Sequence, residues 1–470
     1  MRADDKVTSP RSLYKARAMT DQPPANTVSY RRVFALAWPA SVAAAVTPLL
    51  GAVDVWALAN SSQPLGIAAV ALASIIFSLA YWSFGFIRMS VAGLTAQAVG
   101  AGDEREARAA LIRGSVIGGG IGIILVVLQI PIGIASFHLL ALDSDASAQT
   151  FTAAREYYDI RIWGAPFAIA SYAAFGWFTA RERTDFLMIA SIIITLINII
   201  LDYIFVVHWN WGASGVAAGT LIAEIAGFFV CLGLVILLLM RTGGLKTHWR
   251  DAEYLNPQKL KRTVSVNFDI FVRTGLLSFS FAWFTQRSGA FGDVTLAANQ
   301  VLMQLMLFTG LALDGTAIAA ETLVGQSLGA GGKSGLARYR IAVRRTFEMA
   351  LVTALLFAIA YAVAGGAIIN LLTPEGILRA ESMRYLPWVI ASPLIVVVCF
   401  QLDGVFIGAT RAREMRDSMI ISTAVFIPVS IVLADSFNNH GLWAAFSLYF
   451  ILRALTLALP FRKIERAFDS

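Results

Sequence analysis

The sequence is poor in charged residues, which make up only 14% of its 470 positions. Soluble proteins carry about 25% charged residues, so a water-soluble enzyme is excluded. The charges that occur are unequal: 37 Lys and Arg against 30 Asp and Glu give a net charge of +7. This surplus does not require nucleic acid, because membrane proteins concentrate basic residues in cytoplasmic loops. We expect no nucleic-acid partner.

Cysteine and histidine are also scarce. Cys231 and Cys399 both lie inside apolar runs, so we expect them to pack as small apolar residues and to form no disulfide, metal site or redox pair. The four histidines are scattered and show no metal-ligand spacing. We therefore predict no organic cofactor, no metal other than Na⁺ as the alternative to H⁺ as coupling ion, and no catalytic cluster of an enzyme.

Apolar residues are abundant instead, at 57% of the chain with a mean hydropathy of +0.69. A run of about 20 apolar residues crosses a bilayer as a helix. The sequence predicts an all-α membrane protein, because it contains twelve such runs. They lie at about 33–58, 64–87, 108–135, 155–180, 185–207, 213–240, 263–286, 294–318, 341–371, 384–409, 417–435 and 441–461.

The distribution of basic residues predicts the orientation. With an even number of spans, the alternate connections and both tails hold 30 of the 37 Lys and Arg. The positive-inside rule places these segments in the cytoplasm. The domains expected are a flexible tail 1–32, a lobe 33–240, a basic linker 241–262, a second lobe 263–461 and a tail 462–470. We expect a monomer in a bacterial-type inner membrane with both ends cytoplasmic.

The two lobes show an internal duplication. LGIAAVAL (65–72) aligns with VTLAANQV (294–301), and TAQAVGAG (95–102) with VGQSLGAG (324–331), each at an offset of 229 residues. TAQAVGAG and VGQSLGAG are expected to form glycine-rich loops. Because six spans separate the copies, the repeat is parallel, which predicts two six-helix bundles facing each other across a central cleft.

Five polar residues of the first half are predicted to share one layer near the outer surface. Counting about 1.5 Å per residue along each helix places Asp54, Arg161, Asn198, Asp202 and Thr220 at similar depth. Two carboxylates in a low dielectric repel, so one proton or one Na⁺ would neutralise the pair. The alternative is a structural ion pair in which Arg161 compensates one acid.

Other charges inside spans leave alternatives open. Glu224 would act either as a member of a proton relay or as a hydrogen-bonded interior acid. In the second half, the expected arrangement is a salt-bridge network that holds the lobe together or closes an inner gate. Its members are Asp269, Arg273, Asp314, Asp403 and Arg453, with Asp269 and Arg273 four residues apart on one helix face.

Aromatic residues in the spans offer a place for a substrate. Tyr81, Tyr172, Trp177 and Trp283 could line a cleft for flat lipophilic cations through cation–π contacts. The alternative is that they pack in the lobes or form interfacial belts.

Several motifs together resemble the multidrug and toxic compound extrusion (MATE) family. They are the TAQAVGAG and VGQSLGAG segments, Asp54 in LGAVDVWALA, the stretch 161–186, NIILDYIFV (198–206), ALDG (312–315) and QLDG (401–404). The last three are most similar to its DinF-like subfamily. The resemblance covers about residues 30–460. It implies a V-shaped, twelve-helix exporter that exchanges organic, often cationic, compounds for H⁺ or Na⁺.

The resemblance also implies a cation site. In the family the first-span aspartate, the Asn-x-x-x-Asp of the fifth span and a threonine of the sixth form it, and Asp54, Asn198, Asp202 and Thr220 match these positions. Trp283 and Ser430 occupy the places of Asp54 and Asp202 in the second half, so coupling is expected in one lobe. The cargo would be drugs or toxic metabolites. The competing function is a lipid-linked oligosaccharide flippase of the same superfamily, which should have a cationic cleft.

Overall fold

The structure is a computed structural model that describes residues 28–61, 65–142, 147–241, 257–373 and 376–468. These residues form helices joined by short turns, and no strand occurs among them. The first half contains α2 (Tyr30–Ala59), α3 (Leu65–Phe84), α4 (Phe86–Gly100), α5 (Glu104–Val127), α6 (Gln129–Leu142), α7 (Ala148–Arg161), α8 (Ala165–Ala180), α9 (Thr184–Asp202) and α10 (Gly212–Arg241). The second contains α11 (Pro257–Gly289), α12 (Asp293–Ala330), α13 (Gly332–Leu372), α14 (Ile377–Gly408) and α15 (Ala412–Glu465).

The predicted apolar runs correspond to these helices. Nine helical segments of the described chain are long and apolar enough to cross a membrane, with α3 and α4 counted as one segment. Of the remaining predicted runs, 155–180 spans α7 and α8, 263–286 lies in α11, and 441–461 lies in the second arm of α15. That arm is separate because Asn438 has φ 52° and ψ −140°, which breaks α15 in two. The fold is that of an all-α, multi-pass membrane protein.

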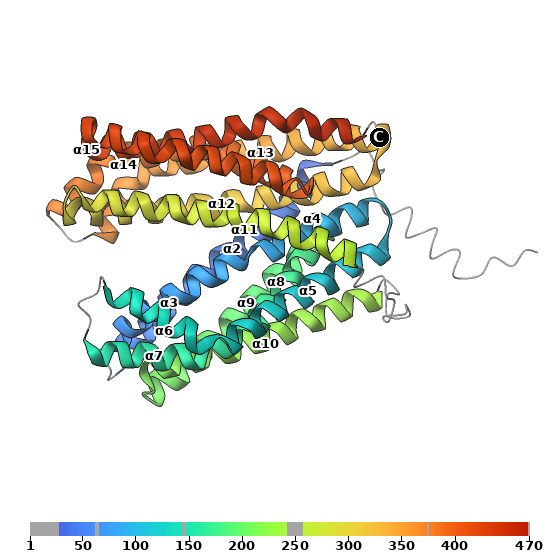
Figure 1. The fold of residues 1–470 in the computed structure, drawn as a ribbon. Coiled ribbons are helices and arrows are strands. Elements are labelled where there is room, and N and C mark those ends of the chain that lie inside the picture. Colours follow the sequence, from blue (N-terminus) through green and yellow to red (C-terminus); the bar gives the residue numbers. More distant parts are fainter. Residues whose placement is uncertain (1–27, 62–64, 143–146, 242–256, 374–375, 469–470) are drawn as a thin grey trace, which may run out of the picture.

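The helices form two lobes in a V (Figure 1). The helices α2 to α10 form the N lobe and α11 to α15 the C lobe, and the lobes diverge toward the end where α6 and α7 lie. At the opposite end α10 finishes, α11 starts and the C-terminus lies. We call this the terminal end. Each lobe has a hydrophobic core, and a smaller buried cluster from α2, α12 and α13 joins the two lobes.

The backbone confirms the internal duplication. Four residues other than glycine have positive φ in the described chain: Glu182, Asn210, Thr410 and Asn438. They form two pairs, 182 with 410 and 210 with 438, each separated by 228 residues. Positive φ is uncommon for such residues, so the same turns occur at equivalent places in both lobes.

Small residues bring the lobes together at the terminal end. A Cβ on Gly100 would lie 2.0 Å from the carbonyl oxygen of Gln326, and one on Gly329 would lie 1.9 Å from that of Gln97. Only glycine allows α4 and α12 to approach so closely. The expected glycine-rich loops were therefore wrong: 93–100 ends α4 and 324–330 ends α12, because these glycines serve helix packing and do not break the helices.

Two hydrogen bonds cross the same interface with the pseudo-symmetry of the repeat. Gln97 Nε2 donates to the carbonyl oxygen of Gly408 at 3.0 Å, and Gln326 Nε2 donates to that of Ala180 at 3.0 Å. Gly408 and Ala180 are the last residues of α14 and α8, so each glutamine satisfies a helix C-terminus of the other lobe.

Helices extend into the predicted tails and linker. Of the tail 1–32, residues 1–27 lie outside the described residues, whereas Tyr30–Arg32 form the first turn of α2. Of the linker 241–262, residues 242–256 lie outside, and α11 already begins at Pro257, a residue suited to the first helical position. The tail 462–470 is helical to Phe468, whose ring packs on Tyr339.

Candidate cation site

Two carboxyl groups meet in the N lobe. Asp54 of α2 and Asp202 of α9 are neighbours that interact electrostatically. Asp202 is fully buried and is the last residue of α9, where the helix widens into the π-helical turn Tyr203–His208. Such widened turns occur frequently at functional sites. Asp54 Oδ1 and both carboxyl oxygens of Asp202 are buried and have no hydrogen-bond partner in the described chain.

Asn198 and Thr220 complete the predicted set. Asn198 lies one turn before Asp202 and donates from Nδ2 to Thr220 Oγ1 at 3.3 Å. Its Oδ1 is buried with no partner among the described residues. Gly219 makes room for the acid, because a Cβ there would lie 2.5 Å from Asp202 Oδ1. The structure thus brings the four sequence-predicted residues together from α2, α9 and α10.

The chemistry of this set is that of oxygen ligands. The two carboxyl groups repel as a doubly ionised pair in an apolar setting. A single proton between them, or one hard cation such as Na⁺, removes this repulsion. The buried oxygens without partners are the atoms that would bind it.

Arg161 pairs with Glu224 and not directly with the aspartates. Its Nη1 donates to the Tyr157 hydroxyl at 2.6 Å, and its Nη2 lies 3.6 Å from Glu224 Oε1. The guanidinium lies 4.6 Å from the centre of the Phe77 ring. The predicted alternative, an ion pair between Arg161 and an aspartate, is therefore wrong in its partner. Arg161 pairs with Glu224 instead, because it is the last residue of α7 and α7 packs against α10, which carries Glu224.

Glu224 is tightly enclosed on one side. Tyr81 donates from its hydroxyl to Glu224 Oε2 at 3.3 Å. A Cβ on Gly164 would lie 1.9 Å from the same oxygen, so the carboxylate occupies space that a side chain at 164 would fill. Tyr172 interacts electrostatically with Glu224 from α8. Tyr81 and Tyr172 are half-buried, whereas the Glu224 side chain is 12% exposed.

Trp177 does not line a cleft, contrary to the prediction. It is fully buried between α8 and α5, and its Nε1 donates to the Ala107 carbonyl oxygen at 3.0 Å. The position of Trp177 along its helix predicts its depth in the membrane, but not whether its side chain points toward the other lobe or into its own lobe. Trp283 is half-buried, and its Nε1 donates to Ser430 Oγ at 2.9 Å. The positions equivalent to the two aspartates thus also meet in the C lobe, but as a neutral pair.

Four of the five charged residues predicted for the C-lobe network form ion pairs within that lobe. Asp403 accepts from Arg273 at 2.5 Å and from Arg453 at 2.7 Å, which joins α11, α14 and α15. Asp269 pairs with Arg416 at 2.5 Å and not with Arg273, although the latter is one turn away, because the two point to different neighbouring helices. Asp314 is exposed and interacts electrostatically with Arg88 of the N lobe, and with Arg273 and Asp403 of its own lobe.

A cross-lobe ion pair was missed by the sequence reasoning. Arg88 of α4 lies 3.5 Å from Glu321 of α12, and Glu321 is buried with its Oε1 unpartnered among the described residues. A signal was available, because Glu321 is an isolated acid in the small-residue stretch 315–325. This pair joins the lobes near the terminal end, whereas the ion pairs of Asp269 and Asp403 do not.

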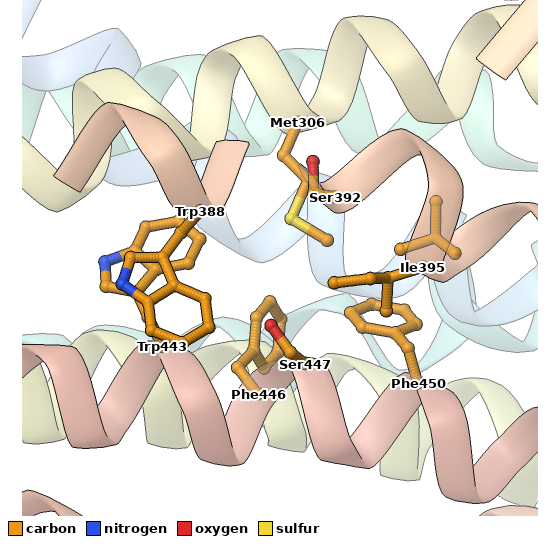
Figure 2. A pocket seen from close by; sticks show the side chains of 9 residues that line it. Met306, Trp388, Ser392, Ile395, Trp443, Phe446, Ser447 and Phe450 are labelled. Atoms are coloured by element: carbon orange, nitrogen blue, oxygen red, sulfur yellow. The ribbon is translucent and has the colours of Figure 1, made fainter. Parts of the chain in front are cut away.

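The C lobe also contains a small pocket (Figure 2). It is lined by Met306, Trp388, Ser392, Ile395, Val396, Trp443, Phe446, Ser447 and Phe450. Ser392 and Ser447 stand 228 residues after Gly164 and Gly219, the two glycines beside the acids of the N lobe. Where the N lobe holds charges, the C lobe therefore holds aromatic rings.

The comparisons with known proteins agree with this architecture. The MatE family model matches residues 39–204 and again 270–434, once in each lobe. The chain belongs to the MatE (MATE) family. It is 34% identical over 442 residues to the DNA damage-inducible protein F of Escherichia coli (strain K12), covering 93% of both chains.

More distant MATE relatives come from bacteria and plants. The probable multidrug resistance protein NorM of Agrobacterium fabrum is 25% identical over 415 residues, which are 84% of this chain and 85% of the relative. The Protein DETOXIFICATION 43 of Arabidopsis thaliana is 25% identical over 338 residues, which are 72% of this chain and 62% of the relative. The crystal structure of MATE in complex with MaD3S has the same fold, with a TM-score of 0.83 at 15% identity over 95% of this chain and 98% of that one.

Proposed function

We propose that this MATE protein is a secondary active exporter of organic, lipophilic cations that exchanges them for H⁺ at Asp54 and Asp202. The observation that carries the proposal is that these two neighbouring carboxyl groups hold three buried oxygens without a hydrogen-bond partner in the described chain. A pair that needs one positive charge to be stable is suited to bind and release a proton. Relatives named as multidrug resistance proteins support the export of drugs or toxic metabolites.

The orientation follows from charge. The terminal end carries most of the basic segments, and the positive-inside rule assigns it to the cytoplasm. The V then opens to the outside of the inner membrane. We infer both termini to be cytoplasmic and the chain to act as a monomer.

Alternating access would connect the acid pair to the lobes through α2. This helix carries Asp54 near the open end and contains Pro39 and Pro48. Nearer the terminal end, Ser41 donates to the Ala312 carbonyl oxygen of α12 at 3.0 Å. Proton binding at Asp54 and Asp202 would repack α2, lower the affinity for cargo between the lobes and release it outside. The empty lobes would then rock inward, and the proton would leave.

The flippase alternative finds little support in the charges. A pyrophosphate-linked substrate requires basic groups free to bind phosphate. Arg88, Arg161, Arg273 and Arg453 each pair with a carboxylate. The drug exporter therefore fits the buried charges better.

The test uses everted membrane vesicles that contain wild type, Asp202→Asn or Asp159→Asn. Asp159 is the matched control, because it is a half-exposed carboxylate of the same lobe paired with Arg155. We expect a pH gradient in sodium-free buffer to drive transport of a fluorescent lipophilic cation by wild type and by the control, but not by Asp202→Asn. Transport only after sodium is added would reassign the site to Na⁺. No transport under either gradient would refute the exporter.

A further inference from the structure

A guanidinium already occupies a cation-binding cage in the N lobe. The Arg161 guanidinium lies over the rings of Phe77, Tyr81 and Tyr157, at 4.6, 5.7 and 5.6 Å from their centres. Glu224 supplies the negative charge. Aromatic faces and one carboxylate are what recognise an organic cation.

Arg161 is held incompletely in this cage. Its distance of 3.6 Å to Glu224 is beyond a good hydrogen bond, and its buried Nε has no partner in the described chain. Within the described chain, the hydrogen bond to Tyr157 is the one close contact of its guanidinium nitrogens. The side chains of Arg161 and Glu224 are 17% and 12% exposed, so both charged groups are partly accessible. An external cation could replace such a loosely bound internal one.

Arg161 also faces the other acids. It interacts electrostatically with Asp54 and with Asp202, whose oxygens lack other partners. The titratable groups around it come from every helix packed at this level. They are Asp54 (α2), Tyr81 (α3), Tyr157 (α7), Tyr172 (α8), Asp202 (α9) and Glu224 (α10), with Arg161 as the single base of the set.

We propose, resting on the proposed function, that Arg161 is a mobile counter-charge shared between a cargo subsite and the proton site. A lipophilic cation binds beside Glu224 and Tyr81 in place of the guanidinium. Arg161 then turns to Asp54 and Asp202, and the proton between them leaves to water. Proton binding reverses the sequence: Arg161 returns to Glu224 and expels the cargo.

The charges balance in this exchange. With one proton on the aspartate pair and Arg161 beside Glu224, the cluster of three acids and one base has a net charge of −1. With cargo bound and the proton lost, one positive charge has entered as another has left, and the net charge is again −1. The O–H bond of the carboxyl is the one covalent bond broken. The electrostatic free energy of holding this net charge in a low-dielectric environment thus changes little between the two states, which suits reversible exchange.

The experiment measures proton release on cargo binding. The purified full chain in weakly buffered detergent solution is titrated with tetraphenylphosphonium, while a pH indicator reports protons and calorimetry reports binding. We expect wild type to release about one proton per cation bound. Arg161→Gln should bind the cation at least as tightly, because the internal competitor is gone, but release no proton. Arg155→Gln, at a partly exposed position of the same helix that pairs with Asp159, should behave as wild type.

Two further variants keep the test sharp if Arg161→Gln folds poorly. Arg161→Lys should still release the proton, since a positive charge remains to exchange. Glu224→Gln should weaken cation binding by about tenfold or more, a change of at least 1.4 kcal/mol. Each variant is checked for its elution volume and melting temperature.

The outcomes separate this inference from the proposed function. Proton release by folded Arg161→Gln equal to wild type would overturn the inference, because the cargo would then meet the aspartates directly. So would undiminished binding by Glu224→Gln, or wild type that binds no tetraphenylphosphonium although its vesicles transport the fluorescent cation. Vesicles of wild type that transport no cation would refute the exporter itself.

Discussion

At the residue scale, two equivalent positions have opposite chemistry. Asp54 and Asp202 meet in the N lobe, whereas Trp283 and Ser430 meet at the matching place in the C lobe. The neutral hydrogen bond is complete by itself, but the carboxyl pair requires an added positive charge. One fold therefore contains one candidate coupling site and one structural contact.

The space around Asp202 gives a residue-scale prediction. Gly219→Ala would place a methyl group 2.5 Å from Asp202 Oδ1 and displace the carboxyl from Asp54. We expect transport to be lost and stability to fall by about 1–3 kcal/mol. Gly233→Ala on the same helix is the control, because its Cβ would meet nothing within 4 Å. Vesicle transport and melting temperature measure the two effects; equal behaviour of both variants would contradict the role of Gly219.

At the element scale, small residues decide how helices cross. The segments 95–100 and 324–329 let the backbones of α4 and α12 touch. Glutamines from these helices then reach the C-termini of α14 and α8 in the opposite lobe. Close packing and the two hydrogen bonds together hold the terminal end closed.

We predict that Gly329→Ala forces α4 and α12 apart, because the new Cβ would lie 1.9 Å from a backbone oxygen that cannot rotate away. The cost should be about 1–3 kcal/mol or more. Gly119→Ala, at a position with nothing within 4 Å, should change little. Hydrogen exchange at the ends of α4 and α12 is the measurement. Unchanged protection in Gly329→Ala would show that the helices do not approach this closely.

The C lobe depends on a charge shared by three helices. Asp403→Asn leaves the buried guanidiniums of Arg273 and Arg453 without their carboxylate. We expect a loss of about 3–5 kcal/mol of stability, as for other broken buried ion pairs. The exposed Asp435 is the control, and Asp435→Asn should stay within about 0.5 kcal/mol. A similar melting temperature for both variants would argue against the network.

At the scale of the whole molecule, two similar lobes meet at one end and open at the other (Figure 1). The contact includes two cross-lobe ion pairs, Arg88 with Glu321 and Lys259 with Glu106. Since Glu321 is buried, separating the lobes would leave its charge without a partner unless water enters. The pair of Arg88 with Glu321 therefore favours the closed terminal end.

A double-mutant cycle tests this pair. Arg88→Gln and Glu321→Gln should each increase hydrogen exchange at the terminal end, because each leaves one charge uncompensated. The double variant should recover part of the loss, with a coupling of about 0.5–3 kcal/mol. Additive effects of the two substitutions would mean that the charges act independently.

The sequence by itself determined the fold class, the duplication and the level of the acids. Apolar runs of bilayer length predict spans, and the fixed rise per residue of a helix converts position into depth. This was enough to group Asp54, Asn198, Asp202 and Thr220. It was also enough to pair position 283 with position 430.

Only the tertiary structure decided which side chains at one depth meet. Arg161 pairs with Glu224, Asp269 pairs with Arg416, and Trp177 turns into the core. The lobes are joined in part by the ion pair of Arg88 with Glu321, which depth counting did not single out. The reason is geometric: a linear sequence fixes height along a helix, whereas helix rotation and crossing, set by packing across the whole chain, fix the direction in which each side chain points.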